Sequence, residues 1–145
     1  MASSASDSLL QRLRASVIDG RAQNSRFKQK QLFSLHAELL VQADAICTAI
    51  AEDTENSAAE VEAEFYLTMT ALRHFYEFVD FDQDLKEEYL VTKGVDNVSR
   101  RVGSGLVVIR PSTYTRLFSI IVPIAAAIAA GNSILLEVCS SSLKY

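Results

Sequence analysis

Cysteine is scarce in this 145-residue chain, and the two that occur do not form a metal-binding pattern. Neither Cys47 nor Cys139 belongs to a CxxC pair, and no group of cysteines and histidines has the spacing of a zinc site. His36 and His74 each stand alone on a helical stretch, so we expect histidines on a helix face. The sequence therefore predicts no metal centre, and its cysteine usage is typical of a reducing compartment.

The chain also lacks a long run of charge of one sign. Its net charge is -4, and the small basic groups at 28–30 and 100–101 cannot provide the concentrated basic surface that nucleic acid requires. No internal repeat is present. Residues 1–8 are small and polar, without the apolar segment of a secretory signal. We expect these residues to be disordered and the protein to be cytoplasmic.

What the sequence does contain first is helical periodicity. Apolar residues recur every three or four positions from Asp7 to Ile18. This spacing predicts a first helix, which Gly20 ends. A second, longer helix is predicted over Ser25–Ala51 and a third over Ser57–Val79. The aromatic residues of the third helix indicate core packing.

From Tyr89 onward the pattern changes. The segments 90–91, 95–98 and 101–102, separated by glycines at 94, 103 and 105, are predicted to be short extended pieces. The run Leu106–Ile109 then suits a buried parallel strand. An alanine-rich helix is predicted over Arg116–Ala130, ended by Gly131-Asn132, and Ile134–Leu136 is predicted to be a second buried strand.

Strand, helix and strand in this order form a βαβ unit. We therefore predict an α/β fold, with N-terminal helices followed by an incomplete Rossmann-like βαβ unit. The predicted domain covers residues 9–139, and residues 140–145 form a tail.

Several blocks in order then resemble the aldehyde dehydrogenase superfamily, in particular its class 3, fatty-aldehyde-type branch. The blocks are Leu13-Arg14 with Gly20, Lys28 and Gln31-Leu32; Asp53 with Ser57 and Glu60; the strand Gly105–Ile109; and Pro123 followed by Ala-Ile-Ala-Ala-Gly-Asn ending at Asn132. Lys28 replaces the usual arginine of the first block. The resemblance covers most of the chain, and its most specific block is the last. It implies that residues 9–139 form part of a cofactor-binding domain.

The resemblance implies NAD(P)-dependent oxidation of an aldehyde to a carboxylic acid, with NAD or NADP as cofactor. That chemistry needs a cysteine thiolate, donors for an oxyanion and a carboxylate base. In the family the cysteine and the base follow well after the first βαβ unit. We therefore expect a truncated protein that is inactive alone. No residue is assigned a catalytic role, and neither Cys47 nor Cys139 has a partner that would activate it.

Three positions correspond to the family's cofactor and oxyanion contacts in degenerate form. The family's Trp-Asn turn is replaced by a turn in which either Thr113 or Tyr114 stands at the asparagine position, depending on the alignment register. Either hydroxyl could donate one hydrogen bond. The lysine that contacts the adenosine ribose is replaced by Glu137. A carboxylate can accept hydrogen bonds from ribose hydroxyls but repels phosphates, which disfavours NADP more than NAD.

Two other functions remain open. Two parallel strands expose polar edges and apolar faces, so the chain could be a non-catalytic subunit that forms a homo-oligomer or pairs with a full-length dehydrogenase. Alternatively, the uncharged stretch Leu117–Leu136 is long enough for a tail anchor in a membrane. Its Pro123, Gly131 and Asn132 make insertion marginal, and we expect no membrane association.

Overall fold

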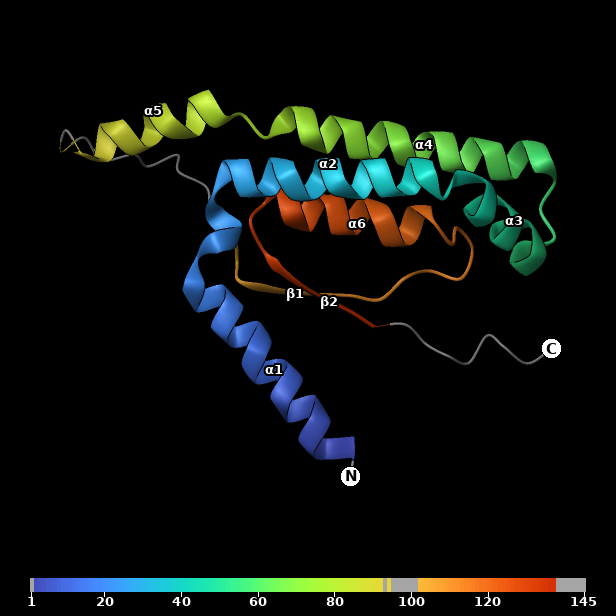
Figure 1. Ribbon diagram of the computed structural model, residues 1–145, viewed down its shortest axis with the longest axis horizontal. Helices are drawn as coiled ribbons and strands as arrows, with labels where there is room; N and C mark the ends of the chain where they lie inside the picture. Colours follow the sequence, from blue (N-terminus) through green and yellow to red (C-terminus); the bar gives the residue numbers. More distant parts are fainter. Residues whose placement is uncertain (1, 93, 95–101, 138–145) are drawn as a thin grey trace.

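The computed structural model describes residues 2–92, 94 and 102–137, in which helices pack around a buried core and a small sheet lies beside one of them (Figure 1). The elements in chain order are α1 (Ala2–Asp19), the 3-10 helix η1 (Arg21–Gln23), α2 (Ser25–Val41), α3 (Ala43–Thr54), α4 (Ala58–Phe78), α5 (Phe81–Thr92), β1 (Leu106–Ile109), α6 (Phe118–Ala129) and β2 (Ser133–Leu136). Helix α6 lies between the sheet on one side and α2 and α4 on the other.

The core forms where α2, α4 and α6 meet. Leu32 of α2 and Leu72 and Thr68 of α4 are fully buried, because each lies on the face of its helix that points toward the other two. Helix α6 contributes two alanines, Ala125 and Ala129, together with Ile121 to this contact. The small alanine side chains allow close approach of the helix backbones, and burial of the surrounding leucine, isoleucine and valine side chains stabilises the contact.

The predicted βαβ unit is confirmed at the level of its elements. Strands β1 and β2 pair in parallel, with Leu106 opposite Ser133 and Ile109 opposite Leu136. Gly131 has a φ of 81° and ends α6 in a Schellman motif, in which its N–H and that of Asn132 donate to carbonyls inside the helix. The α/β class therefore holds for a mostly helical chain with one pair of parallel strands.

Two of the three N-terminal helices differ from the prediction. The third, α4, begins after Ser57 and ends before Val79, as expected. The second is broken at Gln42 into α2 and α3, whose axes differ by 72°, although neither glycine nor proline stands there. The first begins at Ala2, so the segment predicted to be disordered is helical from that residue, since its alanines and serines contain no helix breaker.

Helix α5 occupies a region where the sequence predicted extended structure. Leu90 and Val91 lie within it, so the prediction was wrong there. The Asp80 side chain accepts hydrogen bonds from the N–H groups of Asp82 and Gln83, and this cap starts the helix. The predicted extended pieces at 95–98 and at residue 101 lie outside the described residues.

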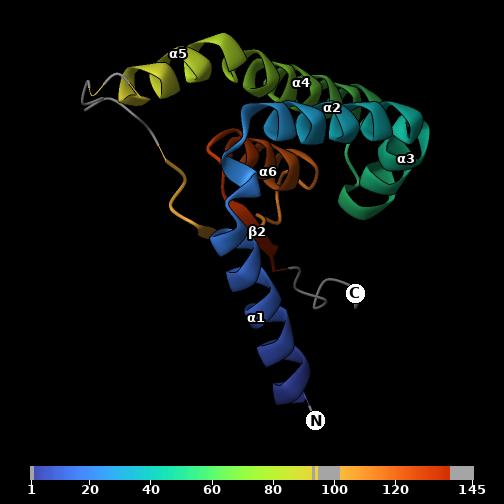
Figure 2. The same cartoon turned by 60° about the vertical axis from the view of Figure 1, so that its left-hand side comes forward.

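Helix α1 leaves the body of the molecule at an angle, and its N-terminal half extends away from the other elements (Figures 1 and 2). Its C-terminal half contacts both strands. The Ser16 hydroxyl shares a hydrogen bond of 2.9 Å with that of Ser133, and a Cβ built on Gly105 would lie 3.3 Å from Val17. The sheet is therefore covered by α6 and partly by α1.

The uncharged stretch Leu117–Leu136 does not form one continuous helix. It is divided into the 12-residue α6, a turn and β2. Within the described ranges, no single helix is both long and apolar enough to cross a membrane, and one bent pair, α2 with α3, meets those criteria by length and composition.

Candidate functional site

The carboxyl ends of the two strands lie side by side and carry an ion pair. Arg110 follows β1 directly and Glu137 follows β2, so the parallel register places them next to each other. The Nη2 and Nε atoms of Arg110 donate to the two carboxylate oxygens of Glu137 at 2.8 and 3.2 Å. This two-point hydrogen bond, and then the positive charge of Arg110, lowers the pKa of Glu137.

The turn that follows Arg110 holds the other two predicted positions. Thr113 and Tyr114 lie there with exposed side chains, and Tyr114 is 87% exposed. The turn is ordered by Ser112, whose hydroxyl accepts from the Tyr114 N–H at 3.2 Å and whose carbonyl accepts from the Ser119 hydroxyl. The fold thus brings all three predicted positions to the carboxyl edge of the sheet, where open α/β sheets bind ligands.

A buried carboxylate occupies the N-terminus of α6. Glu64 of α4 is only 8% exposed, and its Oε1 accepts hydrogen bonds from the N–H groups of Leu117 at 2.8 Å and Phe118 at 3.0 Å. In dinucleotide-binding folds the N–H groups at this place in the βαβ unit bind a phosphate. Here they are satisfied by the protein itself, and the turn from Arg110 to Leu117 contains no glycine. The geometry therefore leaves no phosphate cradle at this helix.

Cys47 does not have the properties of a nucleophile. It is half-buried on α3, and burial, followed by the nearby charges of Asp44 and Glu62, raises the pKa of its thiol. A raised pKa keeps the thiol protonated, whereas catalytic cysteines have lowered values. Cys139 lies outside the described residues. Within the part of the chain that the structure describes, no cluster of histidine, cysteine or carboxylate side chains could hold a metal ion.

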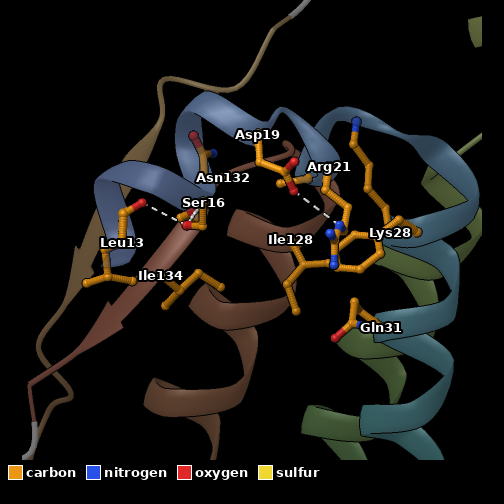
Figure 3. A pocket seen from close by; sticks show the side chains of 12 residues that line it. Leu13, Ser16, Asp19, Arg21, Lys28, Gln31, Ile128, Asn132 and Ile134 are labelled. Atoms are coloured by element: carbon orange, nitrogen blue, oxygen red, sulfur yellow. Dashed lines mark hydrogen bonds and ion pairs between the residues drawn. The ribbon is translucent and has the colours of Figure 1, made fainter. Parts of the chain in front are cut away.

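A cavity of about 400 Å³ lies near the amino end of β2, between α1, η1, α2 and α6 (Figure 3). Its walls combine apolar side chains, such as Leu13, Ile128 and Ile134, with polar ones. Asp19 and Arg21 form an ion pair of 3.2 Å at its rim. This cavity lies at the opposite end of the strands from Arg110 and Glu137, so it is not continuous with the carboxyl edge.

Beside this cavity, Gln23 joins three distant parts of the chain. Its amide nitrogen donates to the Gly131 carbonyl at 3.0 Å, and its amide oxygen accepts from the Gly103 N–H at 3.2 Å. The backbones of Gly103 and Gly131 touch, because a Cβ on Gly103 would lie 2.4 Å from the Gly131 oxygen. Asn132 adds a further link by accepting from the Gly105 N–H.

Most residues that carry the resemblance have structural roles. Ser57 and Glu60 form a capping box at the start of α4, and Leu32 is fully buried. Lys28 is 9% exposed, and a Cβ on Gly131 would touch its side chain. These roles give a structural reason for each of these residues. None of the roles depends on a particular enzymatic activity.

Comparison with known proteins gives no family assignment. No protein-family model, curated protein or solved structure matches the chain. The aldehyde dehydrogenase relationship is therefore taken up below as a proposal.

Sequence reasoning missed three residues of this region: Arg110, Glu64 and Gln23. Arg110 could have been found, since a charged residue directly after each of two parallel strands predicts an ion pair at their ends. Glu64 is visible as a carboxylate on the apolar face of a helix, between Val61 and Thr68. Nothing in the local sequence singles out Gln23, because its partners lie 80 and 108 residues away.

Proposed function

We propose that this chain is an aldehyde dehydrogenase-like cofactor-domain unit that contacts the adenosine part of NAD and has no aldehyde chemistry of its own. The observation that carries the proposal is Glu137 at the carboxyl end of the second strand of a parallel βαβ unit. In dinucleotide-binding folds an acidic residue at the corresponding position accepts hydrogen bonds from the adenosine ribose. The ordered sequence blocks that resemble the aldehyde dehydrogenases supply the family.

The pyrophosphate and nicotinamide parts of NAD would have to be bound by groups other than residues 106–137. The Glu64 carboxylate occupies the N–H groups that would meet a pyrophosphate, and its negative charge opposes a second anion there. Nucleophilic attack likewise needs a residue that the described part of this unit does not supply, since the Cys47 thiol has a raised pKa. Oxidation of an aldehyde to a carboxylic acid would therefore require a catalytic part in addition to this unit.

The same geometry favours NAD over NADP. The 2′-phosphate of NADP would fall next to the Glu137 carboxylate, and two anions in contact repel each other. Arg110 offsets part of this repulsion, but it is already bound to both oxygens of that carboxylate. Adenosine, which carries the ribose and no phosphate, should bind as well as or better than NADP.

A thermal-shift titration of the purified chain with NAD+, NADP+ and adenosine tests the proposal. A ligand that binds only the folded chain raises the melting midpoint by mass action. We expect saturable shifts with NAD+ and adenosine, a smaller one with NADP+, and loss of all three in Glu137→Gln. The exposed Glu62→Gln is the matched control and should bind as the native chain does. A cooperative melt that no adenosine compound shifts would refute the proposal.

A second candidate is a non-catalytic subunit that pairs with a full-length dehydrogenase. It is favoured by the two-stranded sheet, because each strand has one edge without a partner among the described residues. Addition of the chain to an aldehyde dehydrogenase should then change its kcat or its oligomeric state. Unchanged kcat and unchanged size at saturating chain concentration would eliminate this candidate.

A further inference from the structure

A second cavity, called the α5 cavity below, has a volume of about 760 Å³ and lies between α2, α4, α5 and α6. Small-molecule sites usually have volumes of about 300 to 1,000 Å³. Part of its wall is apolar, with Phe75 and Phe78 from α4 and Ala126 and Ala129 from α6. These alanines stand at the opposite end of α6 from the contact with Glu64. The α5 cavity is therefore separate from the carboxyl edge of the sheet.

Lys28 of α2 brings an unpaired ammonium group to this cavity. The residue is 9% exposed, and its Cε atom would lie 3.1 Å from a Cβ built on Gly131, next to Ala130 of the cavity wall. Figure 3 shows its nitrogen pointing away from Leu13 and Ile134, which line the other cavity. Among the described residues the ammonium forms neither a hydrogen bond nor an ion pair. A largely buried charge without a partner is costly, so an anionic group of a ligand would be stabilised beside it.

The wall on the side of α5 carries three carboxylates, from Asp80, Asp84 and Glu87. Their spacing places them along one face of the helix. Each uses one oxygen within the protein. Asp80 caps α5 through Oδ1, and Asp84 accepts from the Ser25 hydroxyl through Oδ2. Glu87 accepts from the Gln83 amide through Oε1 at 2.9 Å. The second oxygen of each carboxylate has no partner within the described ranges. Since three carboxylates face one ammonium, a ligand that matches this cavity carries more positive than negative charge.

We propose that the α5 cavity binds free arginine or a closely related guanidino amino acid. The carboxylate of the ligand pairs with the Lys28 ammonium, and its two cationic groups pair with the carboxylates of α5. A guanidinium suits this wall, because it forms two-point hydrogen bonds with carboxylates and stacks on aromatic rings such as those of Phe75 and Phe78. One negative and two positive charges on the ligand match the unequal charges of the cavity. The inference holds independently of any cofactor binding.

Calorimetric titration of the native chain with three matched ligands tests the two charge contacts separately. The ligands are L-arginine, agmatine, which lacks the carboxylate, and L-citrulline, in which an uncharged urea group replaces the guanidinium. We expect saturable binding of arginine. Agmatine and citrulline should each bind at least about ten times more weakly, because each loses one charge-assisted contact. A native chain that does not bind arginine, or that binds either of the other ligands as tightly, would overturn the proposal.

The substitution Lys28→Met then identifies the group that recognises the carboxylate. Methionine keeps most of the apolar stem of lysine and removes the charge, so the chain should keep its circular dichroism spectrum. Arginine should then bind no more tightly than agmatine. The matched control is Lys86→Met, at an exposed lysine of α5 outside the cavity wall, which should preserve the preference for arginine. If the Lys28→Met chain still prefers arginine to agmatine, the carboxylate is not bound by Lys28 and the proposal fails.

Discussion

The Oε1 atom of Glu64 lies 2.8 Å from the backbone nitrogen of Leu117, so a carboxylate from one helix caps another helix 53 residues later in the chain. The Phe118 N–H donates to the same oxygen. Glu64 is buried, and each of the two N–H groups would otherwise lack a partner at the start of α6. This contact fixes α6 against α4, and with it the βαβ unit against the N-terminal helices.

Replacing Glu64 should lower the free energy of unfolding more than any surface substitution on α4. Glu64→Ala leaves two buried N–H groups without an acceptor and creates a cavity, at a cost of about 3 kcal/mol. Glu64→Gln keeps an amide oxygen and should cost about 1 kcal/mol. Urea unfolding followed by circular dichroism measures both. Glu62→Gln, exposed on the same helix, should change stability by less than about 0.5 kcal/mol.

Two glycines should respond very differently to the same substitution. Gly103→Ala would place a methyl group 2.4 Å from the Gly131 oxygen, so the two backbones must separate. We expect a loss of about 2 to 3 kcal/mol. Gly20 has a φ of 68° but nothing within 4 Å, so Gly20→Ala adds only backbone strain of about 1 kcal/mol. Equal losses in thermal or urea unfolding would contradict the close contact at Gly103.

The ion pair at the carboxyl edge should be visible in a pH titration. Arg110 lowers the pKa of Glu137 in the folded chain, so their interaction is fully present above the ordinary glutamate pKa and is lost as the pH falls through the lowered value. Arg110→Gln should return the Glu137 pKa toward its ordinary value, as measured by NMR of the side-chain carboxyl carbon. Arg21→Gln, near the other end of the strands, serves as the control. If the native titration curve is already ordinary, the pair is absent in solution.

The thiol of Cys47 should be slow to alkylate. Burial, and then the charges of Asp44 and Glu62, raises its pKa, so less thiolate is present at neutral pH than in an unfolded peptide. We expect iodoacetamide labelling, followed by mass spectrometry, to be slower in the native chain than in urea and to rise steeply with pH. Asp44→Asn should increase the native rate modestly. Native labelling as fast as in urea would show that the thiol is not perturbed.

The elements that the sequence predicted correctly are those whose signals are local. The capping residues of α4, the apolar run of β1 and the Gly131-Asn132 end of α6 each specify their structure within a few residues. The parallel pairing followed from the order strand, helix, strand. The positions of Thr113, Tyr114 and Glu137 at one edge follow from the same topology.

The errors have physical causes that differ from one element to the next. At Gln42 the chain bends and α3 packs against α4, and no helix breaker marks the bend. Helix α5 was missed because its many acidic residues obscure its apolar face, although Asp80 was a visible cap. The roles of Glu64 and Gln23 depend on partners far along the chain, which no local pattern can reveal.

The contacts of Gln23 also set the order in which the chain can fold. Its side chain bonds Gly103 and Gly131, 80 and 108 residues later, so this junction cannot close until residue 131 has left the ribosome. Helices α2 and α4 can form earlier, but their buried faces must wait for α6. Contacts between distant parts of a sequence slow folding. During synthesis the apolar faces of these helices are therefore exposed for the longest time, and a chaperone that binds nascent chains should engage them there.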